Sequence, residues 1–469
     1  MTTTKNNEHK KLNFSSEREQ SQACLNSAEH EKNQGRKVLN VPNKREQNQT
    51  CLDSAEREGL RPKGNVPNLR FPEFQGEWEE LGLSELLDFK NGLNPKPDKF
   101  GKGIKFISVM DILNNAVITY DCIKASVDVT EKELSDFSVE KGDLLFQRSS
   151  ETLEDVGRAN VYMDDKTAVF GGFVIRGKKK GEYDPQYFNY LLRSPFARKR
   201  IIPMGAGAQH FNIGQEGLSK VKLHFANIEE QKKIGKMLSL LDERIATQNK
   251  IIDKLQSLIK GMEDNLLDNP LWEKTYLRSF MQFFPTNSLS WEQLSYKEGA
   301  IRNLHYGLIH GLQTRGINSA SLPMIKNEAI PKQYTLCQVG DVAFADASED
   351  TGEIAKSVEF VDIIEGDTIC GLHTIHGRDI KNRTVIGFKG FAFNSRYFHN
   401  QIKRLAQGTK VFSITANNLS SCYVYLPDLE TQKAIVKLLK AYEAQLIISR
   451  KTLKQYDKQK QYLLRQMFI

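Results

Sequence analysis

Several features that define large protein classes are missing from this sequence. No apolar run approaches the roughly 18 residues that a membrane-spanning helix needs, and the polar start MTTTKNNEHKK contains no apolar core of a secretory signal. The six cysteines are scattered without a C-x-x-C pair, which is typical of a reducing compartment rather than of a disulfide scaffold or a zinc module. We therefore expect a cytoplasmic protein.

Signatures of catalysis are missing as well. The phosphate-binding G-x-x-x-x-G-K-[ST] loop does not occur, and Gly205-Ala-Gly-Ala lacks the third glycine and the strand-then-helix context of a dinucleotide site. The Asn/Asp-Pro-Pro-aromatic tetrapeptide of aminomethyltransferases is also absent, and its nearest approach, Asn269-Pro-Leu, fails. We expect no catalytic residue in this chain and no cofactor bound by it.

Composition sets only broad limits. With 469 residues, of which 39% are hydrophobic, the chain can form two or three domain cores. Its net charge of +8 permits a polyanionic partner, but an ordinary basic protein fits that charge equally well. Residues 1–67 stand apart, because they are polar, nearly free of aromatics and internally repeated, with Arg18–Glu29 returning as Arg45–Glu56. We expect a disordered or weakly helical tail there, more consistent with a neutral extension than with a docking segment.

The rest of the chain is an internal duplication. Residues 211–238 match residues 412–439 without a gap, at a shift of 201 positions and with ten identities. The identities fall at Phe211, Ile213, Leu218, Ser219, Glu229, Gln231, Lys232, Ile234, Lys236 and Leu238. Upstream the match is looser, with Gly142-Asp143 returning as Gly340-Asp341 and Gly171 as Gly371.

Each copy is predicted to be a globular domain followed by a long helix. The domains are expected at 69–225 and 271–426, and the helices at 227–267 and 428–468. Short strand-like runs, such as Lys105-Phe-Ile-Ser-Val and the run from Ala168 to Ile175, alternate with Gly, Pro and Asp turns. This pattern predicts an α+β protein with two mixed α/β domains, although the order of the strands does not follow from it.

Both helices carry a heptad pattern and a start signal. Asn227 and Asp428 occupy equivalent positions and are good N-cap residues, with acidic residues in the following turn. The first seam is Ile234, Leu238, Leu241, Ile245, Gln248, Ile252, Leu255, Ile259, Met262 and Leu266. The second is Ile435, Leu439, Tyr442, Leu446, Ser449, Leu453, Tyr456, Lys460, Leu463 and Met467. A solitary helix would expose such a seam, so we expect an antiparallel coiled coil with pseudo-twofold symmetry, in which Gln248 and Ser449 form a matched polar layer.

Two clusters suggest chemistry but are weakened by comparison of the copies. Cys370, His373 and His376 are competent metal ligands, yet their counterparts Phe170, Phe173 and Arg176 are not, which favours an ordinary core strand. The segment Pro427-Asp-Leu-Glu430 with Lys433 resembles a nuclease carboxylate cluster. Its counterpart, Ala226-Asn-Ile-Glu229, has the pattern of a helix cap. We therefore expect no metal site and no nuclease site.

Two divergent domains alternating with two similar heptad helices resemble the specificity subunit of type I restriction-modification enzymes. The resemblance extends from about Pro67 to Ile469. It is most specific at the strand-to-helix junctions that begin Phe211-Asn-Ile and Phe412-Ser-Ile, and in the Gly142-Asp and Gly340-Asp segments.

The resemblance implies a DNA-recognition subunit without catalysis of its own. Each domain would recognise one half of a split, asymmetric target in double-stranded DNA, and the helices would set the spacing. Two modification subunits would dock on the helices and methylate adenine with S-adenosylmethionine, and restriction subunits would add ATP- and Mg-dependent translocation and cleavage.

Candidate DNA contacts are polar or basic segments. The first set is the loop with Arg148, Ser149, Ser150 and Glu151, with Ser348 and Glu349 as counterparts; the second precedes the helices and contains Gln209, His210 and Lys410. The third is basic: Lys178, Lys179, Lys180, Arg198, Lys199 and Arg200. Ordinary solvated loops and structural turns remain alternatives for these segments. At the level of function, the alternatives are a standalone DNA-binding regulator, a coiled-coil scaffold and an enzyme whose site is not apparent.

Overall fold

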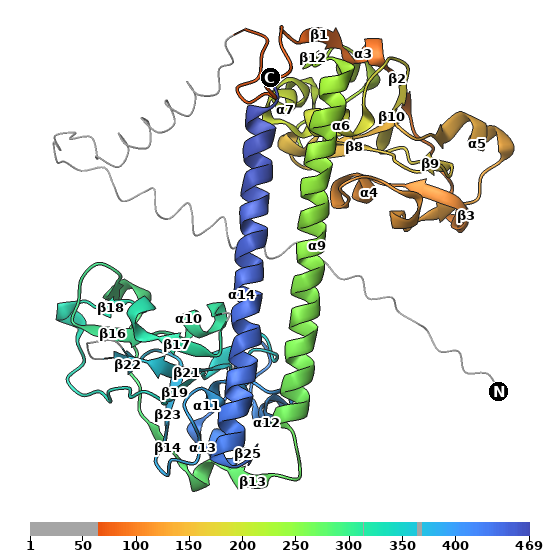
Figure 1. Cartoon of the computed structure of the whole chain (residues 1–469). Coiled ribbons are helices and arrows are strands. Elements are labelled where there is room, and N and C mark those ends of the chain that lie inside the picture. Colours follow the sequence, from red (N-terminus) through yellow and green to blue (C-terminus); the bar gives the residue numbers. More distant parts are fainter. Residues whose placement is uncertain (1–63, 313, 364–367) are drawn as a thin grey trace, which may run out of the picture. The chain divides into compact units, whose positions relative to one another are not determined.

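The computed structural model describes residues 64–312, 314–363 and 368–469. The repeats of the predicted N-terminal tail lie outside this range, so the prediction of a disordered or weakly helical tail is not addressed for residues 1–63. The described chain begins at Gly64, and the Trp78 N–H donates to the carbonyl of Asn65 at 2.7 Å. Residues 64–469 form one compact unit, in which two globular domains are joined by two long helices (Figure 1).

The first globular domain, from β1 to β12, is built on two four-stranded sheets. One has the order β2-β10-β6-β8 and is antiparallel; the other has the order β4-β3-β9-β5, with β3 and β9 parallel. The strands are β1 (Glu79–Gly82), β2 (Leu87–Asn91), β3 (Phe100–Ile107), β4 (Ser126–Val127), β5 (Ser138–Val139), β6 (Leu144–Gln147), β7 (Ser149–Ser150), β8 (Ala159–Val161), β9 (Ala168–Phe170), β10 (Val174–Lys179), β11 (Phe211–Asn212) and β12 (Lys222–Phe225). The helices are α3 (Leu83–Leu86), α4 (Val109–Asn114), α5 (Glu131–Phe137), α6 (Pro185–Arg193), α7 (Pro195–Ile201) and α8 (Gln215–Ser219).

The second globular domain, from β13 to β25, repeats this plan with differences. Its main sheet has the order β14-β23-β19-β21-β17, and its smaller sheet has the order β15-β18-β16-β22. The strands are β13 (Glu273–Tyr276), β14 (Met281–Phe284), β15 (Leu294–Ser295), β16 (Ile301–Leu304), β17 (Gly316–Asn318), β18 (Met324–Ile325), β19 (Val342–Ala345), β20 (Ala347–Ser348), β21 (Ser357–Asp362), β22 (Thr368–Cys370), β23 (Thr374–Asp379), β24 (Phe412–Ser413) and β25 (Tyr423–Leu426). The helices are α10 (Tyr306–Gly311), α11 (Phe388–Ala392), α12 (Arg396–Leu405) and α13 (Ala416–Ser421).

One strand-like run of the sequence is two strands. The run from Ala168 to Ile175 divides into β9 and β10, which belong to different sheets. The break falls at Gly171-Gly172, where a Cβ on Gly172 would lie 1.9 Å from the side-chain oxygen of Asn94. A larger residue there would have to displace the Asn94 side chain, so glycine suits the point where the chain leaves one sheet and enters the other within three residues.

The long helices are α9 (Ile228–Leu267) and α14 (Leu429–Gln466), and they begin at the predicted caps. The side chain of Asn227 accepts from the Glu230 N–H, and that of Asp428 accepts from the Thr431 N–H, both at 2.9 Å. The helices pack against each other (Figure 1). Their direction is antiparallel, since Asp242 pairs with Lys460 and Gln248 donates to the carbonyl of Ser449 at 3.2 Å. Every predicted seam position is buried or half-buried. The antiparallel coiled coil is confirmed.

Each domain core includes the start of one long helix and the end of the other. In the first domain, Ile234 and Leu238 of α9 pack with Met467, Phe468 and Ile469, which follow α14. In the second, Ile435 and Leu439 of α14 pack with Leu267 at the end of α9. The reciprocal packing ties each domain to both helices.

A glutamine near the start of each helix makes the same connection in both copies. The Gln231 amide donates to the carbonyl of Ala226 at 2.8 Å and accepts from the Asp184 N–H at 3.0 Å. Gln432 is its counterpart, and its amide donates to the Pro427 carbonyl at 2.9 Å and accepts from the Val385 N–H at 3.0 Å. Both side chains are buried, so these bonds fix each helix to the loop that precedes the domain's helical layer.

Candidate functional site

In the first domain the structure joins two of the predicted DNA-contact segments. Strand β7, in the loop after β6, pairs antiparallel with β11, so that Ser149 lies opposite Asn212 and Ser150 opposite Phe211. The Ser149 hydroxyl donates to the side-chain oxygen of Asn212. Residues about sixty positions apart in the sequence therefore form one small surface.

A tight hairpin carries the outer part of this surface. Ala206 and Asn212 exchange backbone hydrogen bonds at 2.8 and 2.9 Å, which closes a turn over residues 207–211. Gly207 has φ +143°, and a Cβ there would lie 2.0 Å from the His210 carbonyl oxygen. The predicted contact residues Gln209 and His210 follow at the tip, where both are exposed.

The second domain builds the same arrangement with different side chains. Strand β20 pairs with β24, so that Ser348 lies opposite Phe412, and Gln407 and Ser413 close the turn as Ala206 and Asn212 do. Gly408 takes the place of Gly207, with φ +125° and a Cβ position 2.0 Å from the Val411 carbonyl oxygen. The exposed tip here contains Thr409, Lys410 and Val411. We call these two surfaces, residues 148–151 with 207–212 and residues 346–349 with 408–413, the hairpin surfaces.

The residues at the base of each hairpin surface differ in chemistry. Two of them, Phe173 and His373, were not among the DNA contacts predicted from the sequence. The Arg148 N–H donates to the Phe173 carbonyl, and the Asp346 N–H donates to the carbonyl of His373. The Phe173 side chain is 69% exposed, beside a hollow of about 420 Å³ that Met110 and Ser149 also line. In the second domain, His373 instead lies 3.1 Å from the Asp346 carboxylate. Only the backbone pairing shows that position 173 belongs here, because an aromatic after two glycines carries no DNA-binding signal by itself.

The basic candidates of the first domain do not join its hairpin surface. Lys178, Lys179 and Lys180 lie at the far end of β10 from Val174, which is the end that pairs with Gln147 next to the loop. Lys178 pairs with Glu140 at 3.2 Å, and Lys180 pairs with Asp88 at 3.6 Å. The three lysines are therefore separated from the loop by the length of a strand.

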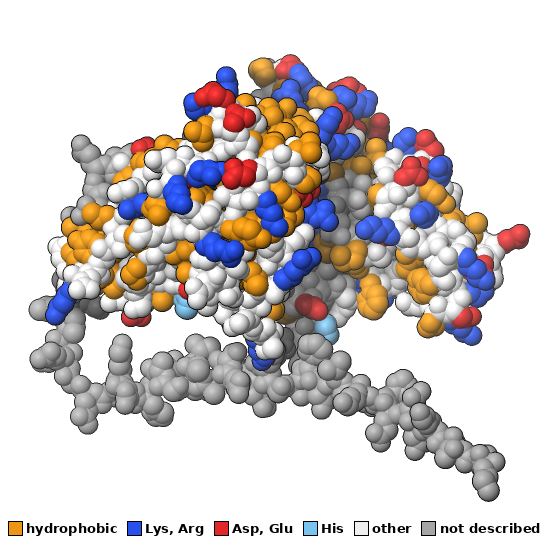
Figure 2. Space-filling model, turned by 90° about the horizontal axis from the view of Figure 1, so that it is seen from below, with side chains coloured by type: hydrophobic (Ala, Val, Ile, Leu, Met, Phe, Trp, Pro, Cys, Tyr) orange, Lys and Arg blue, Asp and Glu red, His pale blue; other side chains and the backbone are white. Residues whose placement is uncertain are grey.

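The arginines of α7 already have partners within the chain. Arg198 donates to the carbonyls of Glu154 and Val156 at 2.8 and 2.7 Å, and burial lowers its pKa to about 10, so it remains a cation. Arg200 donates to the carbonyl of Ile469 at 3.4 Å, whereas Lys199 is exposed. The sequence shows the charge of this run, but not the carbonyl groups that two of its members meet. On the face shown in Figure 2, basic side chains are interspersed with acidic and apolar ones.

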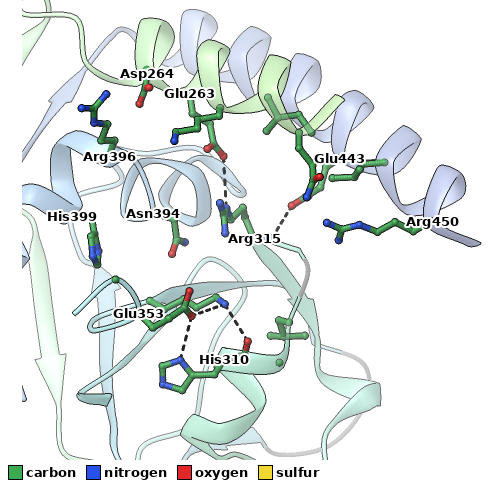
Figure 3. A pocket seen from close by; sticks show the side chains of 18 residues that line it. Glu263, Asp264, His310, Arg315, Glu353, Asn394, Arg396, His399, Glu443 and Arg450 are labelled. Carbon is green, nitrogen blue, oxygen red and sulfur yellow. Dashed lines mark hydrogen bonds and ion pairs between the residues drawn. The ribbon is translucent and has the colours of Figure 1, made fainter. Parts of the chain in front are cut away.

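A charged pocket of about 760 Å³ lies where α9 and α14 meet the second domain (Figure 3). Arg315 connects the two helices there: its Nε lies 3.6 Å from Glu263 of α9, and its backbone N–H donates to Glu443 of α14 at 2.9 Å. Burial raises the pKa of both carboxyl groups. On the far wall, Glu353 pairs with Lys356 at 2.8 Å. Through Arg315, the second domain therefore contacts both helices.

The structure treats the suspected nuclease cluster and the suspected metal cluster differently. Asp428 accepts from the N–H and hydroxyl of Thr431, and Glu430 pairs with Lys433 at 2.6 Å, so the interpretation as a helix cap is confirmed. In the suspected metal cluster, Cys370 and His376 are buried near each other, and Cys337 lies beside them. His373 instead lies at the base of the second hairpin surface, 3.1 Å from the Asp346 carboxylate.

The fold and the hairpin surfaces define a class: a duplicated protein in which two domains with different exposed hairpin residues are joined through one antiparallel pair of helices. A family profile, "Type I restriction modification DNA specificity domain", matches residues 75–257 and 371–456, more than half of the chain. The chain belongs to this family of specificity subunits. Its function is DNA sequence recognition within a type I restriction-modification complex.

Curated relatives of the chain include further specificity subunits. The putative type I restriction enzyme MjaX specificity subunit of Methanocaldococcus jannaschii is 26% identical over 418 residues, which cover 85% of this chain and 95% of the relative. The MjaVIII specificity subunit of the same organism is 24% identical over 417 residues, with 84% and 92% covered. The crystal structure of the type I restriction-modification S subunit from M. genitalium has a TM-score of 0.54 at 15% identity, covering 86% of this chain and 99% of that one. This likeness shows the shared fold.

Among the residues that the structure describes, no helix is both long and apolar enough to cross a membrane.

Proposed function

We propose that each domain, predicted at 69–225 and 271–426, recognises one half of a bipartite, asymmetric DNA sequence through its hairpin surface. The observation that carries this proposal is the repetition of one backbone arrangement with different exposed side chains. Ser149, Ser150, Glu151, Gln209 and His210 serve the first half-site. Ser348, Glu349 and Lys410 serve the second. Hydroxyl, amide, imidazole and carboxylate groups of this kind match the donors and acceptors of base edges, and Lys410 suits a phosphate.

The helical pair sets the distance between the half-sites. Half-sites on a duplex are separated by steps of about 3.4 Å, and a helix of 40 residues is about 60 Å long at ~1.5 Å per residue. Because each domain core contains residues of both helices, the spacing depends on the pair as a rigid unit. Two different half-sites require two different domains, which agrees with the divergence of the hairpin surfaces.

The finer division of labour follows the family resemblance. Two modification subunits dock on the helices and carry adenine methylation with S-adenosylmethionine, and restriction subunits supply ATP- and Mg-dependent cleavage. This chain directs them and binds none of these cofactors. A standalone DNA-binding regulator is not favoured, since the relatives along most of the chain are specificity subunits.

Methylome sequencing of a host with and without this chain tests the proposal. With the modification subunit expressed, we expect one bipartite adenine-containing motif to lose its methylation when the chain is deleted and to regain it when the chain is restored. If no bipartite motif changes while the modification subunit is present, the proposal is wrong.

A further inference from the structure

Three buried side chains of the second domain bring potential metal ligands together. Cys337 precedes β19, Cys370 ends β22 and His376 lies in β23, and all three are at most 7% exposed. The two sulfur atoms are 3.6 Å apart, and one ligand atom from each residue lies within 4.8 Å of the others. Sulfur atoms bound about 2.3 Å from one tetrahedral zinc ion are separated by a similar distance.

The imidazole of His376 is held as a ligating histidine would be. Its Nε2 lies 2.7 Å from the carboxylate of Asp341, while its Nδ1 is buried and has no hydrogen-bond partner among the described residues. Histidines that bind metals usually donate the other ring N–H to a carboxylate, which leaves the ligating nitrogen with its lone pair. An unpartnered buried nitrogen is costly unless something occupies it.

The charges around the cluster also suit a divalent cation. Asp341 is neutralised by Arg378, whose Nε and Nη2 lie 2.8 and 2.7 Å from its two oxygens. A dication bound by two thiolates and one neutral imidazole then has no net charge, which satisfies the requirement for burial. Binding releases the two thiol protons to solvent.

We propose that Cys337, Cys370 and His376 bind one Zn²⁺ ion. Zinc is favoured because two thiolates and an imidazole form a soft ligand set that prefers tetrahedral coordination. The ion would tie β22 and β23 to the segment that leads into β19, and so stiffen the sheet behind the hairpin surface of the second domain.

The first domain has no such site. The positions equivalent to Cys337, Cys370 and His376 hold Val139, Phe170 and Arg176, and the Arg176 guanidinium donates to the carbonyl of Ser138. The comparison of the copies therefore excludes a metal site common to both domains. It is compatible with a site that is present in the second domain alone. The proposal does not depend on the identity of the DNA target.

Metal analysis of the purified full-length chain tests the proposal. After growth with zinc and gel filtration without chelator, elemental mass spectrometry should find close to one zinc ion per chain. Replacement by Co²⁺ should produce the intense visible absorption and the thiolate-to-cobalt charge-transfer band of a tetrahedral site with sulfur ligands. This spectrum needs no variant, so a folding defect cannot obscure it.

Variants assign the ligands. Cys337→Ser, Cys370→Ser and His376→Gln should each abolish the stoichiometric zinc and the charge-transfer band, with folding checked by near-UV circular dichroism. Cys422→Ser is the matched control, since Cys422 is a buried thiol of the same domain outside the cluster, and it should keep both. Absence of zinc and of the cobalt spectrum in the folded wild-type chain would overturn the proposal. So would a Cys337–Cys370 disulfide in the chain purified under nitrogen.

Discussion

The two copies agree in the contacts that hold helix to domain and differ where the chain is exposed. Gln231 and Gln432 make the same pair of hydrogen bonds, and the hairpins close through the same backbone pairing. In contrast, Gln209-His210 at one tip is replaced by Lys410-Val411 at the other, at the same 201-residue shift. Retained contacts therefore mark the framework of the repeat, and the divergent positions are the exposed side chains in which the two domains differ.

One contact between helix and domain has different partners in the two copies but the same role. Asp242 of α9 and Glu443 of α14 are equivalent positions at the 201-residue shift. Asp242 accepts from the Tyr190 hydroxyl at 2.8 Å, whereas Glu443 accepts from the backbone N–H of Arg315 at 2.9 Å. In both copies a helix carboxylate holds the domain, although the donors are unrelated.

The largest expected effect comes from exchanging a whole domain. If residues 69–225 are replaced by the corresponding domain of another family member, we expect one half of the methylated motif to change completely. The other half and the spacer length should stay the same, because the helices and the second domain are untouched. Methylome sequencing measures this, and the reciprocal exchange of 271–426 is the control. A change in both halves would contradict independent recognition by the two domains.

Loss of the buried glutamines should destabilise each domain at its helix. Gln432→Ala removes three hydrogen bonds and leaves buried backbone groups unpaired, which we expect to cost about 2–4 kcal/mol. Gln231→Ala removes two and should cost about 1 kcal/mol less. Hydrogen-exchange mass spectrometry would show the loss of protection in the affected domain only. The exposed Gln459→Ala on α14 should have no effect, and equal loss in both domains would contradict the comparison.

The hairpin tips should differ in how they respond to salt. Lys410→Ala should weaken DNA binding about tenfold and reduce the salt slope by about 1, because one phosphate contact is lost. Gln209→Ala, in the first domain, should alter discrimination among first half-site sequences without changing the salt slope. Titrations of labelled duplexes at several salt concentrations measure both effects. The exposed Lys297→Ala in the second domain serves as the control, and a salt slope unchanged by Lys410→Ala would exclude its phosphate contact.

The smallest expected effect is a pH dependence that Glu263, at the contact of α9 with the second domain, contributes to stability. Burial raises the pKa of Glu263 in the folded protein, so its protonation stabilises the fold, and this contribution is lost as pH rises through the raised pKa. We expect Glu263→Gln to flatten the decrease of the melting temperature as pH rises above the usual range of a glutamate, which corresponds to less than about 1 kcal/mol in stability. Differential scanning calorimetry measures it. The exposed Asp253→Asn on the same helix should leave the slope unchanged, and an unaltered slope in Glu263→Gln would contradict the prediction.

The parts of the fold that the sequence predicted are those determined by local or repeated patterns. The caps at Asn227 and Asp428 follow from residue type and position, and the antiparallel pair follows from two seams that need a partner. Strand order was not predicted, because a strand such as β6 is an apolar run whose neighbours β8 and β10 are chosen by long-range packing.

The candidate site was predicted in pieces but not as a surface. The loop at Ser149 and the turn at Gln209 appeared as separate candidates, and only the pairing of β7 with β11 joins them. Arg198 was predicted from charge, although its guanidinium meets the carbonyls of Glu154 and Val156. The sequence did not predict Cys337 as a neighbour of Cys370, because 33 residues separate them and no motif spacing links them.

The packing of residues 467–469 into the first domain also gives the chain the connectivity of a ring. The Leu69 N–H donates to the Gln466 carbonyl at 2.9 Å, and the Phe468 ring lies 6.4 Å from that of Trp78. A path from the first domain along α9, through the second domain and back along α14 therefore returns to its starting point. The contacts of the helical pair therefore do not depend on which copy comes first in the sequence. A circular permutant, with the chain joined across this contact and opened after α9, would preserve every one of them.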